Sequence, residues 1–226
     1  MATVNPSLQR PQPSLPNRLL LNPAAKPLLG LLCLLPLGWL FWAAWHDQLG
    51  ANPAEALIRE LGDWTLRFLV LVLLVTPVRT VAGWPALARM RRMLGLFVFF
   101  YASLHLLAYA WFDMGLDLAA IVHDTGQRRF ILVGMLSWLL LLALAATSFN
   151  RAIRWLGAAR WQALHRAVYA VAVLGILHFF WMRAGKNNFA EVWVYAAILG
   201  GLLGWRLWRR LERRRGLQAS GTSMRS

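Results

Sequence analysis

Long apolar runs separated by short charged segments dominate the pattern of this 226-residue chain. A helix needs about 20 apolar residues to cross a bilayer core of about 30 Å, because each residue adds about 1.5 Å. Six runs approach that length, at residues 28–46, 61–78, 93–112, 130–148, 164–182 and 189–208. The pattern therefore predicts an all-α protein, a polytopic membrane bundle of six transmembrane helices.

The runs divide the chain into three segments. Residues 1–27 form a Pro-rich leader, 28–208 the transmembrane domain, and 209–226 a basic tail. The first run exceeds the apolar part of a signal peptide, which spans about 7–15 residues, so we expect it to be retained. Two prolines, Pro36 and Pro77, are expected to interrupt the first two runs.

Composition agrees with a membrane protein and narrows its chemistry. Hydrophobic residues make up 59% of the chain and charged residues 15%, against about 45–50% and 25% in globular domains. The net charge of +15 lacks the solvated basic domain that a nucleic-acid partner would require, so we expect no nucleic acid. The single cysteine, Cys33, excludes an internal disulfide and any site built from several thiolates.

Charged residues outside the runs are sorted by side. Seventeen Lys and Arg lie in the leader, after the second and fourth runs, and from Arg206 onward, whereas the opposite loops hold five. The positive-inside rule then places both termini in the cytoplasm, with the basic residues near anionic membrane lipid. Eight of the nine acids, Glu191 among them, fall on the outer side. Seven of these are expected to make an acidic rim that docks a partner: Asp47, Glu55, Glu60, Asp63, Asp113, Asp117 and Asp124.

Three histidines lie within apolar runs, His105 in 93–112 and His165 and His178 in 164–182. Ionisable groups inside a membrane are costly and mark functional sites by default, although a lone buried histidine is more often a core residue. Zinc or di-iron sites favour nearby cysteines or carboxylates. Haem needs only axial nitrogens and an apolar, aromatic-lined slot, so these histidines favour haem.

Depth separates the three histidines. If the run 93–112 enters from the cytoplasm, His105 lies roughly 18 Å along it, and His178 lies roughly 20 Å beyond His165. We therefore expect His105 and His178 at similar outward depths and His165 near the inner face. On an ideal helix, His165 and His178 point roughly 140° apart, so facing one neighbour would require a distortion, for which Gly175 is a candidate.

Three segments carry a resemblance to a known family. They read RRMLGLFVFFYASLHLLAY, ILVGMLSWLLLLALAATS and WQALHRAVYAVAVLGILHFFW. They resemble the MsrQ family of haem-binding membrane subunits, within the wider ferric-reductase-like transmembrane group. The resemblance implies one or two b-type haems, with His105 and His178 as axial ligands of an outer haem and His165 as a ligand nearer the cytoplasm.

The resemblance also suggests a role for Arg91. Larger relatives carry a second histidine fourteen residues before the position that matches His105, and this chain has Arg91 there. We expect Arg91 to contact a haem propionate, a flavin phosphate or lipid. FMN is a further cofactor that the family implies, and no residue pattern in the chain locates it.

The same resemblance implies an electron-transfer function in the bacterial inner membrane. Electrons would come from the quinone pool or a cytoplasmic flavin reductase and leave to MsrP, a periplasmic molybdopterin reductase that repairs methionine sulfoxide in proteins. Catalysis would then lie in the partner. Two alternatives stay open: a quinol-linked cytochrome that serves another acceptor, and a small-solute or proton transporter in which the histidines relay protons.

Overall fold

The structure, a computed structural model, describes residues 14–185 and 187–223, and every regular element in these ranges is a helix. The elements in chain order are α1 (Leu15–Leu21), α2 (Ala25–Trp45), α3 (Pro53–Val81), η2 (Pro85–Arg89), α4 (Arg91–Ala108), η3 (Tyr109–Asp113), α5 (Leu118–Gln127), α6 (Arg129–Ala146), α7 (Asn150–Leu156), α8 (Ala158–His165), α9 (Val168–Ala184) and α10 (Ala190–Ser223). The all-α prediction is confirmed for this part of the chain.

Five stretches of the described chain are long and apolar enough to cross a membrane. They are α2, α3, α4 with η3, α6, and α8 with α9, and they coincide with the first five predicted runs. The sixth predicted run, 189–208, falls on α10 from residue 190 onward, and α10 is a helix of 34 residues. The chain is thus a multi-pass membrane protein, and the sixth crossing stays a prediction.

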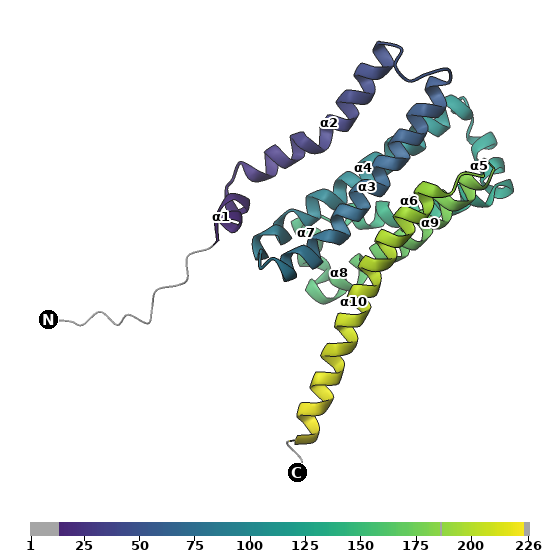
Figure 1. Cartoon of the computed structure of the whole chain (residues 1–226). Coiled ribbons are helices and arrows are strands. Elements are labelled where there is room, and N and C mark those ends of the chain that lie inside the picture. Colours follow the sequence, from purple (N-terminus) through teal and green to yellow (C-terminus); the bar gives the residue numbers. More distant parts are fainter. Residues whose placement is uncertain (1–13, 186, 224–226) are drawn as a thin grey trace.

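Four helices form the centre of the bundle. The most extensive packing joins α3 to α4 and α6 to α9, and α4 also packs against α6. Helix α10 covers α3 and α9, whereas α2 lies along the outside of the bundle (Figure 1). One end, called here the inner end, carries α1, α7, α8 and the C-terminal part of α10; the outer end carries the α2–α3 turn and α5.

Both prolines predicted to interrupt the first two runs lie inside continuous helices, so that prediction is wrong. Polar side chains from neighbouring helices support the backbone there. Proline denies a partner to the carbonyl four residues earlier, which for Pro77 is that of Leu73. The guanidinium of Arg206 on α10 donates to this carbonyl. Buried backbone groups inside a membrane require such partners.

The turn around Pro36 is supported by Tyr101, a fully buried residue on α4. Its hydroxyl donates to the Cys33 carbonyl at 2.8 Å and accepts from the Leu37 amide at 3.2 Å. In a regular helix the Leu37 amide would donate directly to the Cys33 carbonyl, four residues earlier, and Pro36 lies in this turn. The hydroxyl therefore joins them and fastens α2 to the bundle.

Replacing Tyr101 by Phe should destabilise the protein by about 1–3 kcal/mol, because a buried donor and a buried acceptor lose their shared partner. The midpoint of thermal unfolding in detergent measures this loss. Tyr195→Phe is the matched control, since the Tyr195 ring packs on Phe179 and no described residue bonds its hydroxyl. Equal midpoints for the two variants would show that the hydroxyl does not hold α2.

Candidate cofactor sites in the helix bundle

One face of each central helix is turned toward the middle of the bundle. Residues on these faces recur every three or four positions, which places them along one side of a helix. On α3 the series is Ile58, Gly62, Thr65, Leu69, Val72, Thr76 and Arg79. Two cavities open along these faces, an outer cavity that reaches the outer end and an inner cavity at the inner end.

The outer cavity has a volume of about 340 Å³ and lies between α3, α4, α6 and α9. Its walls are mainly apolar, and two of the three intramembrane histidines, His105 from α4 and His178 from α9, line it. Their ring centroids are 6.1 Å apart and their planes cross at 88°. The structure therefore brings together the two histidines that the depth argument placed at one level.

Each of these rings is held by a helix carbonyl. Nδ1 of His105 lies 2.8 Å from the carbonyl oxygen of Ile58, and Nδ1 of His178 lies 2.6 Å from that of Phe130. A carbonyl can only accept, so the hydrogen of each neutral ring is on Nδ1. Nε2 of each ring keeps its lone pair for a ligand.

Two glycines make this contact possible. Gly62 and Gly134 lie four residues after Ile58 and Phe130, one helical turn above the accepting carbonyls. A Cβ at Gly62 would lie 3.2 Å from Nδ1 and Cε1 of His105, and one at Gly134 would lie 2.9 Å from the same atoms of His178. A side chain at either position would keep the histidine ring away from the carbonyl. The α3–α4 pair and the α6–α9 pair therefore each use a glycine to bring a histidine against a helix backbone.

The outer cavity fits a haem. Metal–imidazole bonds are about 2 Å long, so two rings on opposite sides of one metal ion have centroids roughly 6 Å apart. The observed separation of 6.1 Å matches this value. Ser137, which also lines the cavity, has a buried hydroxyl with no partner among the described residues. Two neutral imidazoles that line an apolar cavity are a ligand set that haem takes from a protein.

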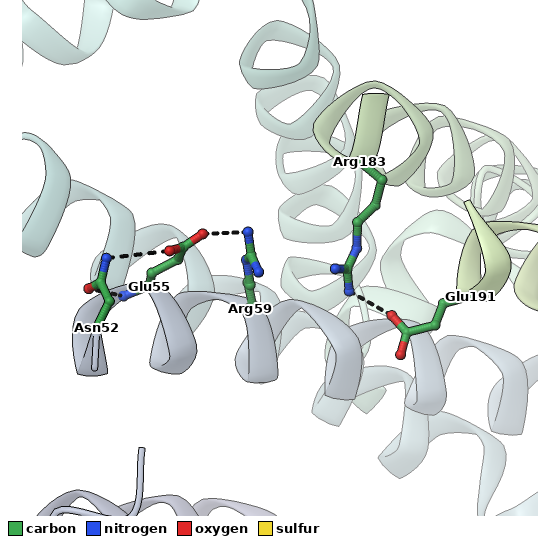
Figure 2. Close-up of polar contacts among 5 residues, drawn as sticks. All are labelled: Asn52, Glu55, Arg59, Arg183 and Glu191. Carbon is green, nitrogen blue, oxygen red and sulfur yellow. Dashed lines mark hydrogen bonds and ion pairs between the residues drawn. The ribbon is translucent and has the colours of Figure 1, made fainter. Parts of the chain in front are cut away.

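Charged side chains surround the outer mouth of this cavity, and several of the predicted rim acids are paired. Figure 2 shows Glu55 beside Asn52 and in an ion pair with Arg59, and Arg183 bonded to Glu191 at 2.6 Å. A further pair joins Arg128 to Asp124 at 2.8 Å, and Asp124 also accepts from the Tyr109 hydroxyl at 2.6 Å. Arginines are therefore interspersed with the acids at the outer end, and docking of a partner on an acidic rim stays a prediction.

The inner cavity, of about 460 Å³, brings His165 and Arg91 into one site. Nδ1 of His165 lies 3.1 Å from the Trp161 carbonyl, and its Nε2 lies 3.3 Å from the Ser148 hydroxyl. The Trp161 ring stacks on the imidazole with centroids 3.9 Å apart. His165 thus occupies a different cavity from His105 and His178.

The distortion that separates His165 from His178 lies just after His165. Helix α8 ends at His165 and α9 begins at Val168, with two turn residues between them. Gly175 lies inside α9, which is continuous there, so its candidacy as the distorted position is wrong. The break lets one apolar run serve two cavities.

One residue is common to the linings of the two cavities. Leu141 on α6 is buried and lines both of them. Groups bound in the two cavities would both lie near this side chain. The two sites are therefore neighbours along the axis of the bundle.

Comparison with known proteins assigns the chain to a family. The family model described as "Ferric reductase like transmembrane component" matches residues 61–176. Among curated proteins, the "Protein-methionine-sulfoxide reductase heme-binding subunit MsrQ" of Polaromonas naphthalenivorans is 67% identical over 84% of this chain and 86% of its own length. The chain belongs to the MsrQ family.

Other MsrQ proteins are similar over comparable lengths. The Bordetella pertussis protein is 52% identical over 82% of this chain and 91% of its own length, and the Rhodospirillum rubrum protein is 49% identical over 81% and 87%. No solved structure matches the chain. The resemblance to the MsrQ family is therefore confirmed.

Sequence reasoning missed several residues of these sites in this MsrQ-family chain. Gly62 and Gly134 carried a usable signal, because each is an isolated glycine inside an apolar helix. Ser137 and Leu141 carried none, since serine and leucine are ordinary residues of membrane helices. Their positions follow only from the packing of α6 against its neighbours.

Gly134→Ala should lower stability by about 1–3 kcal/mol, because its methyl group would overlap the His178 ring and displace it from the Phe130 carbonyl. The midpoint of thermal unfolding measures the effect. The matched control is Gly200→Ala on α10, where an added Cβ meets nothing within 4 Å and alanine favours the helix. A Gly134→Ala protein as stable as Gly200→Ala would exclude the tight contact.

Proposed function

We propose that the chain is the haem-binding, electron-transferring subunit of a methionine sulfoxide reductase system. The observation that carries this proposal is the pair of inward-facing imidazoles, His105 and His178, in an apolar cavity of an MsrQ-family chain. The relatives from Polaromonas and Bordetella are themselves described as haem-binding subunits.

In this proposal His105 and His178 are the two axial ligands of a b-type haem in the outer cavity. Bound haem supplies reversible one-electron chemistry at its iron. The chain fixes the direction of both ligands through the carbonyls of Ile58 and Phe130, which also make Nε2 a better donor. Apolar walls keep water away from the ligand nitrogens.

The inner cavity provides a second cofactor position. His165 and Arg91 line it together, which supports their proposed contact with a cofactor nearer the cytoplasm, either a second haem or FMN. Electrons enter at this end, from the quinone pool or a cytoplasmic flavin reductase, and pass the Leu141 side chain to the outer cavity. The shared wall supports a short route between the two positions.

The acceptor is an MsrP-type periplasmic molybdopterin reductase that docks at the outer end and reduces methionine sulfoxide itself. The distribution of basic residues supports an inner-membrane protein with both termini in the cytoplasm. Because the outer mouth carries both arginines and acids, the partner surface should be of mixed charge. We propose a docking surface of mixed charge in place of a purely acidic docking rim.

Alanine variants of the histidines test the ligand assignment. His105→Ala and His178→Ala should each reduce haem per polypeptide toward zero, or convert a low-spin spectrum to a high-spin one, since each removes one of two ligands. His165→Ala should keep the low-spin spectrum of the outer haem, because His165 lines the other cavity. Haem stoichiometry and low-temperature reduced spectra of the purified proteins measure these outcomes.

His123→Ala is the matched control, since His123 is exposed on α5 at the outer end. It should retain wild-type haem content. Unchanged low-spin spectra in His105→Ala and His178→Ala would overturn the ligand pair. A wild-type chain without a Soret band would overturn haem binding altogether.

A further inference from the structure

The two helix pairs at the centre of the bundle repeat one arrangement. In each pair a carbonyl of one helix accepts from a histidine on the other, and a glycine four residues after that carbonyl makes room for the ring. The carbonyl of Ile58 lies 47 residues before His105, and that of Phe130 lies 48 residues before His178. Helix α3 therefore corresponds to α6, and α4 corresponds to α9.

The correspondence continues along the helices at a constant spacing. From Ile58 to Phe130 the spacing is 72 positions, and from His105 to His178 it is 73. The spacing of 72 joins further residues that line one cavity together: Thr65 with Ser137 and Leu66 with Trp138 in the outer cavity, and Val72 with Leu144 in the inner cavity. The spacing of 73 joins Ala102 to Gly175, and both line the outer cavity. A spacing that holds over several helical turns marks two copies of one helix pair.

The two copies run in the same direction through the bundle. Helices α3 and α6 both begin at the outer end, and α4 and α9 both begin at the inner end (Figure 1). Parallel repeats of this kind are related by half a turn about an axis along the membrane normal. That rotation exchanges His105 with His178. A flat ligand that lies between the two imidazoles therefore meets equivalent walls on its two faces.

A b-type haem has a near-symmetry of its own that matches this axis. Half a turn about the line that passes through the iron and between the two propionates exchanges the two faces and the two propionates. The four substituents farthest from the propionates then change between methyl and vinyl. The propionates are acidic, so they favour the charged mouth, where Arg59 and Arg128 lie, over the apolar inner part of the cavity. The inner part therefore decides between the two orientations.

Equivalent walls in this inner part differ in one place by much more than elsewhere. The pairs that differ by one methyl group are Thr65 with Ser137 and Ala102 with Gly175. Leu66 on α3 faces the cavity where Trp138 on α6 presents an indole. The indole is fixed in place, because its Nε1 donates to the Ser103 hydroxyl at 3.0 Å and its ring lies 6.0 Å from that of Phe99.

We infer that Trp138 is a positioning residue that selects one of the two orientations of a haem in the outer cavity. This inference rests on the proposed function, which makes haem the ligand of His105 and His178. The two orientations place either a methyl or a vinyl group beside the indole, and these groups differ by one carbon atom. Protein interiors are packed so closely that a difference of this size is felt.

Proton magnetic resonance of the oxidised, full-length protein in detergent micelles tests the inference. The iron shifts the haem methyl signals away from those of the protein, and each orientation gives its own set. One set should exceed the other at least about five-fold in the wild type, as expected for one carbon atom forced against a packed wall. Trp138→Leu makes the two walls alike and should bring the sets to within about two-fold of each other. Exchanging both residues, Leu66→Trp with Trp138→Leu, should reverse which set dominates.

Trp64→Leu is the matched control, because Trp64 on α3 is also partly buried but lines neither cavity. It should keep the wild-type ratio. A haem whose methyl and vinyl groups are arranged symmetrically about the same axis provides a second control. It should give one set of signals in every variant, which shows that the two sets come from haem orientation and not from two protein conformations.

Two results would overturn the role of Trp138: equal sets in the wild type, or a wild-type ratio retained in Trp138→Leu. If the exchange variant does not fold, the comparison of Trp138→Leu with the wild type still decides. A wild-type protein that takes up no haem shows no Soret band, and this outcome contradicts the proposed function together with the inference. Haem bound in a ratio that ignores Trp138 contradicts the inference alone.

Discussion

The hydrogen bonds from Nδ1 of His105 and His178 to helix carbonyls are the constraint on which the outer cavity depends. Each bond crosses a packed helix pair, α4 to α3 and α9 to α6. Each also places the ring hydrogen on Nδ1, which leaves the lone pair of Nε2 free of a protein partner among the described residues. Gly62 and Gly134 are the cost of this arrangement, because glycine weakens a helix by roughly 0.5–1 kcal/mol relative to alanine. The gain is that backbone atoms, instead of mobile side chains, fix the orientation of both imidazoles.

The same four helix faces continue from the outer cavity to the inner one, and the chemistry changes along them. At the outer end, arginines and acids neutralise one another around the mouth. Among the described residues that line the inner cavity there are four arginines and no acid. The sites therefore differ in what they can hold: neutral nitrogens suit a metal, and guanidinium groups suit an anion. Leu141 lines both cavities, so the two sites are neighbours.

Much of this arrangement could be predicted from the sequence. Run lengths gave the first five crossings, because the thickness of a bilayer fixes the length of a helix that spans it. The relative depths of the three histidines followed from the rise per residue, and the structure places His105 beside His178 and His165 apart. To predict these depths, it was enough to know from which side of the membrane each run enters. No knowledge of side-chain packing was needed.

Other features depend on contacts between distant segments. Pro36 and Pro77 were expected to break their helices, but Tyr101 and Arg206 supply partners from elsewhere in the chain. The outer acids were expected to form a rim, and the structure adds that arginines one helical turn away pair with two of them, Glu55 and Asp124. The helix distortion was predicted at Gly175, because glycine is a common site of helix irregularity. The actual break follows His165, where the turn consists of ordinary residues that carry no such signal.

The central claim, that His105 and His178 ligate one haem with their rings crossed, is tested most directly by electron paramagnetic resonance of the oxidised, purified chain. Imidazole planes that cross at 88° leave two iron d orbitals nearly equal in energy, which produces a highly anisotropic low-spin ferric signal. The account predicts that signal from the outer haem. A high-spin ferric signal, or the rhombic low-spin signal of parallel imidazoles, would contradict it.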